Sequence, residues 1–118
     1  MKWIELKNNT QLEEIKKVSE EQPVMLFKHS TRCSISATAL NRLERTWNDQ
    51  DMATIKPYFL DLISYRSISN AVADSFGIRH ESPQLLIIYK GECVYHASHM
   101  GISYPGLKMQ VESLMKSA

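Results

Sequence analysis

A short, nearly continuous apolar run at residues 24–29, VMLFKH, leads into an amphipathic helical pattern at 33–47. An apolar run of this length predicts a strand buried on both faces, and such strands occur in parallel sheets that helices cover. The helical pattern repeats apolar residues at helix spacing and places charged residues between them. A buried strand that feeds such a helix favours an α/β fold.

The rest of the chain continues this alternation. Strands are predicted at 2–6, 56–62, 84–89 and 92–97, and the Lys90-Gly91 turn joins the last two as an antiparallel hairpin. The order β-α-β-α-β-α-β-β-α implies a mixed central sheet with helices on both faces, and ligands at the carboxyl ends of its parallel strands. Because the sequence has no internal repeat, low-complexity segment or linker, residues 1–118 are expected to form one domain.

Capping residues mark the expected ends of the other three helices. Gly77 ends the third helix, since glycine is a usual C-terminal residue. Pro105 lies in the first turn of the last helix, where its missing N–H has no cost. The predicted N-terminal caps are a Thr10-x-x-Glu13 capping box for a helix through about Ser19, Ser67 or Ser69 for the third helix, and Ser103 for the last.

Composition and charge exclude several classes of protein. The chain has 14 Lys and Arg against 13 Asp and Glu and no block of like charge, which argues against nucleic-acid or polybasic membrane binding. It has no apolar signal region, and its apolar runs are far shorter than the ~20 residues of a membrane helix, so we expect a cytoplasmic protein. The two cysteines and four histidines match no zinc pattern, so no metal or other cofactor is expected.

Cys33 lies in the polar segment that joins the central strand to the next helix. The first turn of a helix offers unpaired backbone N–H groups and the positive end of the helix dipole, and both favour a thiolate, the nucleophilic form of cysteine. The cations Lys28 and Arg32 are expected to add to this effect. Polar neighbours do not suit a buried structural cysteine. We therefore predict that Cys33 is a reactive nucleophile.

Ser36 occupies the position where a dithiol redox site would carry its second cysteine. Its hydroxyl can donate a hydrogen bond to a thiolate but cannot form a disulfide. Cys93 is the other candidate resolving cysteine, and a core or surface role is expected for it instead. His29 is close enough in sequence to act as a base, although a strand residue can equally point away. The site is therefore predicted to be monothiol.

Two segments, VMLFKHSTRCSIS and FGIRHESPQLLIIYKGECVYHASHMGIS, resemble a thioredoxin-fold protein together with the final helix. The resemblance implies that the Ser82–Pro83 bond is cis, that Pro83 faces Cys33, and that the backbone of Ser82 pairs with an extended disulfide substrate. Phe27 stands where thioredoxins carry a buried acid, which argues against general dithiol reductase activity. The resemblance depends on the order of Gly77-Ile78, Ser82-Pro83, Lys90-Gly91-Glu92 and Gly101.

More closely, FKHSTRCSIS with ESPQ resembles the monothiol bacilliredoxins of the bacillithiol system in Gram-positive bacteria, whose motif is Thr-Cys-Pro-Ile-Ser. Ser34 stands where that motif has Pro. The resemblance implies that Cys33 attacks the mixed disulfide between a protein cysteine and bacillithiol, takes the small thiol onto itself and is freed by a second thiol. Bacillithiol is then a co-substrate and bacillithiolated proteins are the partners. The substrate-binding residues implied are Thr31, Arg32, Ser34, Ser36, Ser82 and Pro83, with Lys28, Arg32 or Arg79 meeting the malate of bacillithiol.

Two other functions are compatible with these residues. In a thioredoxin-fold binding module, the edge at Pro83 would hold a peptide and Cys33 would have no chemical role. In a redox sensor, oxidation of Cys33 would act through a change of conformation. Turnover with a mixed-disulfide substrate separates the enzyme from both.

Overall fold

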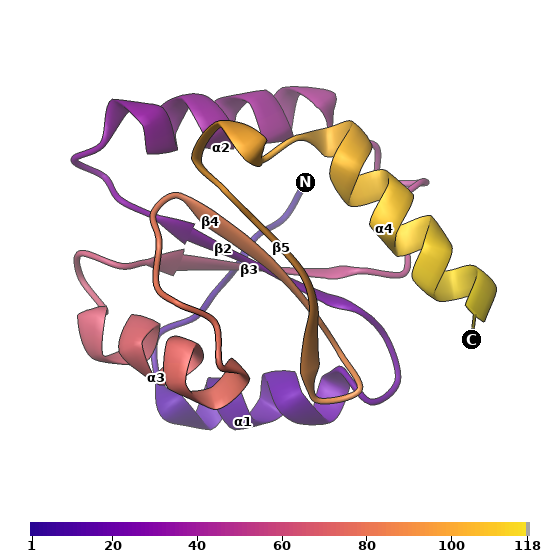
Figure 1. The fold of residues 1–118 in the computed structure, drawn as a ribbon, viewed down its shortest axis with the longest axis horizontal. Helices are drawn as coiled ribbons and strands as arrows, with labels where there is room; N and C mark the ends of the chain where they lie inside the picture. Colours follow the sequence, from indigo (N-terminus) through magenta and orange to yellow (C-terminus); the bar gives the residue numbers. More distant parts are fainter. Residues whose placement is uncertain (118) are drawn as a thin grey trace.

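The structure is a computed structural model that describes residues 1–117. Strands and helices alternate along these residues until a closing hairpin and helix (Figure 1). The elements are β1 (Ile4–Glu5), α1 (Asn9–Val18), β2 (Val24–His29), α2 (Ser34–Thr46), β3 (Lys56–Asp61), α3 (Arg66–Phe76), β4 (Gln84–Tyr89), β5 (Glu92–Ser98), the 3₁₀ turn η1 (His99–Gly101) and α4 (Tyr104–Ser117).

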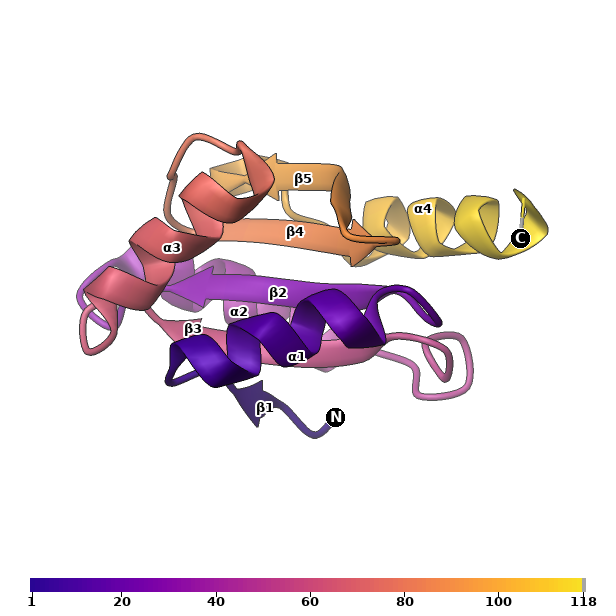
Figure 2. The same cartoon turned by 90° about the horizontal axis from the view of Figure 1, so that it is seen from below.

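The five described strands form one mixed sheet in the order β1-β3-β2-β4-β5. Figure 2 shows the strands in this order, from β1 at the bottom to β5 at the top. β3 runs parallel to both β1 and β2, whereas β4 runs antiparallel to β2 and β5. The carboxyl ends of β2 and β3 therefore lie at the same edge of the sheet as the start of β4. The predicted fold class is confirmed, and β2 is the central strand.

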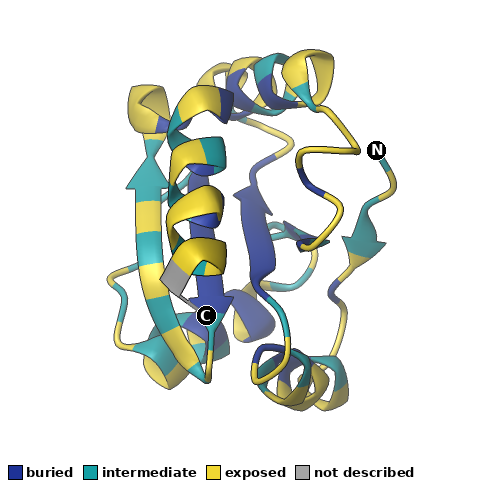
Figure 3. Cartoon of the chain, turned by 90° about the vertical axis from the view of Figure 1, so that its right-hand side faces the viewer, coloured by how far each residue is buried: buried dark blue, intermediate teal, exposed yellow. Residues whose placement is uncertain are grey.

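Helices cover both faces of this sheet. Helices α2 and α4 lie over one face, and α1 and α3 lie over the other (Figure 1). Successive side chains of a strand point to opposite faces, so Phe27 packs with α2 and α4 whereas Leu26 packs with α1 and α3. Every residue of β2 is buried, and the burial is visible as a dark core between exposed helix faces in Figure 3.

Two predicted helix caps are wrong, and neighbouring polar residues explain both. Helix α1 is capped by Asn8, which lies two residues before the predicted cap Thr10. The side chain of Asn8 accepts the Gln11 N–H at 2.9 Å, so the helix already has its N-terminal cap. Helix α3 begins at Arg66, and the residue before it, Tyr65, makes no side-chain cap. The turn before the helix is instead closed by the carboxylate of Asp61, which accepts the N–H groups of Ile63 and Ser64.

The other expected helix ends are confirmed. Gly77 follows α3 with φ 64°, in the left-handed region that glycine adopts without a steric penalty. Ser103 accepts the Gly106 N–H at 3.2 Å at the start of α4. No helix among residues 1–117 has both the length and the hydropathy that crossing a membrane requires.

Candidate active site

Cys33 is the residue immediately before α2 and has extended backbone geometry, with φ −115° and ψ 119°. Its N–H donates to Ser30 O at 3.2 Å, and its carbonyl accepts the Ala37 N–H at 3.1 Å. The thiol is half-buried, and no side chain caps the first N–H groups of α2. The residue at this position normally accepts hydrogen bonds from those N–H groups with its own side chain. A Cys33 thiolate is therefore well placed to accept hydrogen bonds from them.

The residues around Cys33 differ sharply in exposure. Thr31, Arg32 and Ser34 are exposed, so they are free to meet a substrate that approaches the thiol. Ile35 is also exposed, at 46%, and adds an apolar side chain beside the cysteine. A polar and cationic rim with an apolar neighbour suits recognition of a disulfide-bonded polypeptide.

Ser36 differs from this rim because it is fully buried. Its hydroxyl oxygen accepts the Ser30 N–H at 3.1 Å and lies 2.7 Å from His29 Nδ1, so the two side chains share one hydrogen bond in either tautomer of the imidazole. A serine at this position can donate to a thiolate, but the hydrogen-bond partners of this hydroxyl are Ser30 and His29. Ser36 thus fixes the turn between β2 and α2 that carries Cys33.

His29 points towards α2 and not away from it. Its ring lies against the rings of Phe27 and Phe59, with centroids 6.3 Å and 5.4 Å away. This burial lowers the pKa of His29, and the negative charges of Asp61 and Glu44 oppose the shift only in part. His29 is therefore neutral at pH 7 and acts on Ser36 through a neutral imidazole.

The segment before β4 brings Ser82 and Pro83 to the same edge of the sheet. Lys28 of β2 pairs with Gln84 of β4 in the antiparallel register, so the residues that precede Gln84 lie beside the carboxyl end of β2. The Ser82–Pro83 peptide bond is cis, and Pro83 is buried. Cys33 follows the same end of β2, and the chain thus collects the thiol and this segment at one edge.

Ser82 has an unusual hydroxyl. Its Oγ atom is buried and has no hydrogen-bond partner among the described residues. A buried hydroxyl without a partner is costly, and it is more often paired than not. The Ser82 hydroxyl is therefore an unsatisfied polar group enclosed beside Pro83.

Lys28 is not a surface cation, so the expectation that it meets the malate of bacillithiol is wrong. Its side chain is fully buried on the α1 and α3 face, opposite the face that His29 occupies. The ammonium donates to Ser69 O at 3.2 Å and to His80 Nδ1 at 3.3 Å. The physical reason is strand alternation, which sends Lys28 and His29 to opposite faces of a sheet that is covered on both.

Cys93 lies far from Cys33. It pairs with Ile88 of β4, which in turn pairs with Val24 at the beginning of β2, whereas Cys33 follows the end of β2. Five strand residues span roughly 16 Å, whereas a disulfide requires Cα atoms within about 7 Å. Burial also raises the pKa of the Cys93 thiol, which donates to Tyr95 O at 3.3 Å. This cysteine packs against the core and is not placed to resolve an adduct on Cys33.

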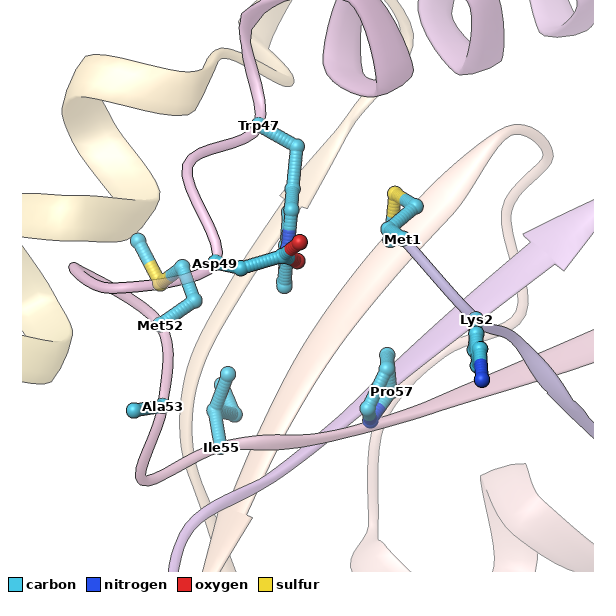
Figure 4. Close-up of a pocket in the computed structure, with 8 residues that line it drawn as sticks. All are labelled: Met1, Lys2, Trp47, Asp49, Met52, Ala53, Ile55 and Pro57. Carbon is cyan, nitrogen blue, oxygen red and sulfur yellow. The ribbon is translucent and has the colours of Figure 1, made fainter.

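A pocket of about 370 Å³ lies at the other end of α2. Trp47 follows the last residue of α2, and Cys33 precedes the first, so the 13-residue helix separates them by roughly 20 Å. Trp47 Nε1 donates to Asp49 Oδ1 at 3.0 Å on the pocket wall. The pocket is therefore separate from the thiol. Figure 4 shows its lining residues, which are Met1, Lys2, Trp47, Asp49, Met52, Ala53, Ile55 and Pro57.

The contacts of His80 and Gln84 were not foreseen from the sequence. Hydrogen bonds of both residues fix the segment before Pro83. In the sequence, only their closeness to the Ser82-Pro83 pair indicated that they could have such a role. Among residues 1–117, no group of three or more histidine, cysteine, aspartate or glutamate side chains is arranged to hold a metal ion. The chemistry available at this edge is that of the Cys33 thiol.

Comparisons with known proteins agree with this geometry. The family model for monothiol bacilliredoxin BrxC matches residues 4–107. A solved thioredoxin-fold structure assigned as an oxidoreductase is 30% identical, with a TM-score of 0.76 and 92% of each chain covered. Thioredoxin from Trypanosoma brucei brucei is 16% identical, with a TM-score of 0.74, 98% of this chain and 92% of that one covered. Thioredoxin from Malassezia sympodialis is 14% identical, with a TM-score of 0.73, 95% of this chain and 90% of that one covered.

The two thioredoxins show the fold, and they carry no further conclusion at that identity. The family match adds the type of chemistry, because it spans both Cys33 and Pro83. The sequence motif and the position at the carboxyl end of β2 both favour Cys33 as the reactive cysteine. The chain belongs to the monothiol bacilliredoxin family, which makes it a thioredoxin-fold thiol oxidoreductase.

Proposed function

We propose that this protein removes bacillithiol from mixed disulfides on other proteins, with Cys33 as the nucleophile. One observation carries the proposal: Cys33 sits at the start of α2, and the residue in the resolving position, Ser36, is a buried serine. Such a site can exchange thiols but cannot close a disulfide of its own. The family match over residues 4–107 supports bacillithiol as the small thiol.

The proposed cycle has two exchange steps. The Cys33 thiolate attacks the bacillithiol sulfur of the mixed disulfide, the old S–S bond breaks, and the client cysteine leaves as a thiolate that takes up a proton. A bacillithiol thiolate then attacks the adduct on Cys33, giving bacillithiol disulfide and the free Cys33 thiolate. Each step breaks one S–S bond and forms one, so the client cysteine is reduced while the second bacillithiol is oxidised into the disulfide, and no other oxidant or reductant is needed.

Binding of the client is assigned to the segment that precedes β4. The backbone of Ser82 is proposed to pair with the extended chain around the client disulfide, as a strand pairs with a sheet edge. Thr31 and Ser34, both exposed beside Cys33, would line the other side of the same site.

Recognition of the small thiol is assigned to Arg32. Its side chain is exposed next to Cys33, and a guanidinium can bind a carboxylate of malate with two hydrogen bonds. Arg79, also exposed, precedes the Ser82–Pro83 pair and is a second candidate. Lys28 takes no part in this contact because it is buried. The proposed setting is a reducing cytosol, where mixed disulfides of this kind are reversed.

The experiment that tests the proposal follows the loss of bacillithiol from a bacillithiolated protein. Wild-type protein and Cys93→Ala should both remove the adduct with free bacillithiol present, whereas Cys33→Ala should be inactive yet folded. Retained activity in Cys33→Ala would exclude this nucleophile. Removal of glutathione at the same rate as bacillithiol would exclude the assignment of the small thiol.

A further inference from the structure

Lys28 is a buried cation without a counter-charge. Its side chain is 0% exposed, and none of the ion pairs among the described residues includes it. The ammonium is held by two neutral acceptors, Ser69 O and His80 Nδ1. Lys28 thus connects the central strand to helix α3 and to the segment that leads to Pro83.

This arrangement does not favour stability. Burial lowers the pKa of Lys28 from 10.5 to about 8, so the folded protein disfavours the charged form. A methionine of similar length would fill the same space without that cost, and His80 Nδ1 would keep the Ser69 hydroxyl, 3.3 Å away, as a hydrogen-bond partner. The charge at Lys28 therefore needs a reason other than packing, and its two contacts suggest one.

Lys28 and Gln84 both make hydrogen bonds to the short segment of residues 79–81. The two residues pair across β2 and β4, and both are fully buried. Gln84 donates from Nε2 to Arg79 O at 3.0 Å and accepts the Glu81 N–H at 3.5 Å. Lys28 donates to His80, the residue between Arg79 and Glu81. Two paired residues of the sheet thereby hold residues 79–81.

On its other side, this segment is joined to η1. Pro83 O accepts the His99 N–H at 3.0 Å, and the imidazole of His99 lies 3.5 Å from a carboxylate oxygen of Glu81. The contacts at Lys28 and Gln84 come from the sheet, and those at His99 come from the chain beside α2. The segment is consequently fixed from two directions, next to the client-binding backbone of Ser82.

We propose that Lys28 is a positioning residue, whose buried ammonium holds His80 and thereby fixes residues 79–83 for client binding. The proposal rests on the proposed function of the Ser82 backbone. Lys28 acts through His80 and touches neither substrate nor Cys33. Its removal should weaken binding of a protein substrate and leave the intrinsic reactivity of the thiol unchanged.

The contact should also depend on pH in a defined direction. His80 must keep Nδ1 unprotonated to accept from Lys28. Burial lowers the pKa of His80, the charges of Lys28 and Arg66 lower it further, and Glu81 opposes them. Below its pKa, a protonated His80 would lose the hydrogen bond and repel the ammonium. Above about pH 8, Lys28 loses its charge, so client binding should be strongest between these limits.

The test compares Lys28→Met with Lys17→Met, a matched change at an exposed lysine of α1. For Lys28→Met we expect a higher Tm together with a KM for a bacillithiolated protein that rises on the order of tenfold, the size of one charge-assisted hydrogen bond. Its KM should lose the pH dependence of the wild type between pH 5 and 9. Lys17→Met should match the wild type. A lower Tm with unchanged KM would assign Lys28 to packing and overturn the proposal.

A second variant approaches the same contact from the other side. His80→Ala removes the acceptor and leaves the ammonium with one partner, so Tm should fall while KM rises as in Lys28→Met. Opposite changes in stability with the same change in KM cannot come from a packing role. A wild-type KM in His80→Ala would overturn the proposal.

Hydrogen exchange separates this proposal from the proposed function. The amide of Glu81 should exchange faster in Lys28→Met than in the wild type or in Lys17→Met, whatever the substrate is. Equal exchange in all three proteins would overturn the positioning role. If wild-type protein fails to act on any bacillithiolated protein while the exchange difference is present, the proposed function fails and the positioning of residues 79–83 by Lys28 remains.

Discussion

His29 Nδ1 and Ser36 Oγ lie 2.7 Å apart, and both side chains are buried. Ser36 stands where a dithiol oxidoreductase would have its second cysteine, and here its hydroxyl binds the imidazole and the Ser30 N–H. The resolving position is therefore occupied by a structural contact. This contact ties the end of β2 to the first turn of α2, the two elements that place Cys33.

Removal of the Ser36 hydroxyl should destabilise the protein. In Ser36→Ala, the Ser30 N–H and His29 Nδ1 would both be left buried without this partner, at a cost of about 1–3 kcal/mol in the free energy of unfolding. Ser34→Ala, at an exposed position two residues away, should change it by less than about 0.5 kcal/mol. Denaturant unfolding of both variants measures the difference, and equal stabilities would contradict the role of this hydroxyl.

A cysteine at position 36 should change the type of mechanism. Ser36→Cys would place a second thiol three residues after Cys33, so the adduct can be displaced from within the chain and a disulfide can form between Cys33 and the introduced thiol. Release of bacillithiol should then no longer need free small thiol. Mass spectrometry of the oxidised variant checks this, with Ser34→Cys as the control. Persistence of the adduct in Ser36→Cys would show that the two positions cannot pair.

The pKa shift of His29 predicts how stability depends on pH. Its pKa is lowered in the folded state, so the unfolded chain binds more protons once the pH falls below about 6.5. The free energy of unfolding should therefore decrease from pH 7 to pH 5. His80 contributes with the same sign. His29→Asn, which retains a hydrogen-bonding atom near Nδ1, should flatten the decrease in part, and an unchanged slope would contradict the assignment.

The sequence predicted the order of elements and the position of Cys33 because both follow from local patterns. The apolar run at 24–29 and the helical periodicity after it leave few ways to place a cysteine between them. Lys28 was wrongly expected at the surface, because the pattern of a strand buried on both faces does not show which groups enclose its last residues. A lysine at the end of a strand is usually solvated, and only the packing of α3 and of the segment at His80 encloses it.

The contacts among distant polar residues were also beyond sequence reasoning. Gln84 and Arg79, like His29 and Ser36, meet through short-range hydrogen bonds whose partners depend on side-chain direction. Strand alternation places His29 and Phe27 on one face, but it does not say which residue of α2 faces them. The role proposed for Arg32 depends on no such internal contact, because its side chain is exposed and its partner would be a bound thiol.

Recognition of malate by Arg32 should appear as a difference between small thiols. Bacillithiol should remove the adduct from Cys33 faster than an uncharged thiol of similar pKa, and the advantage should shrink at high ionic strength because exposed charge pairs are screened. Arg32→Ala should narrow the advantage at low salt, whereas Lys17→Met, which removes a distant exposed charge, should not. Regeneration rates with both thiols measure this, and equal wild-type rates at low salt would remove Arg32 from the site.

The most direct measurement of the central claim is the intact mass of the protein after reaction with a bacillithiol mixed disulfide in the absence of free thiol. With Cys33 alone at the site and Cys93 at the start of β5, the protein should carry one bacillithiol per chain, located on Cys33, and keep it until free bacillithiol is added. Cys93→Ala should behave in the same way. A protein that instead loses the adduct and two hydrogens, with Cys33 and Cys93 joined in a disulfide, would contradict the monothiol mechanism.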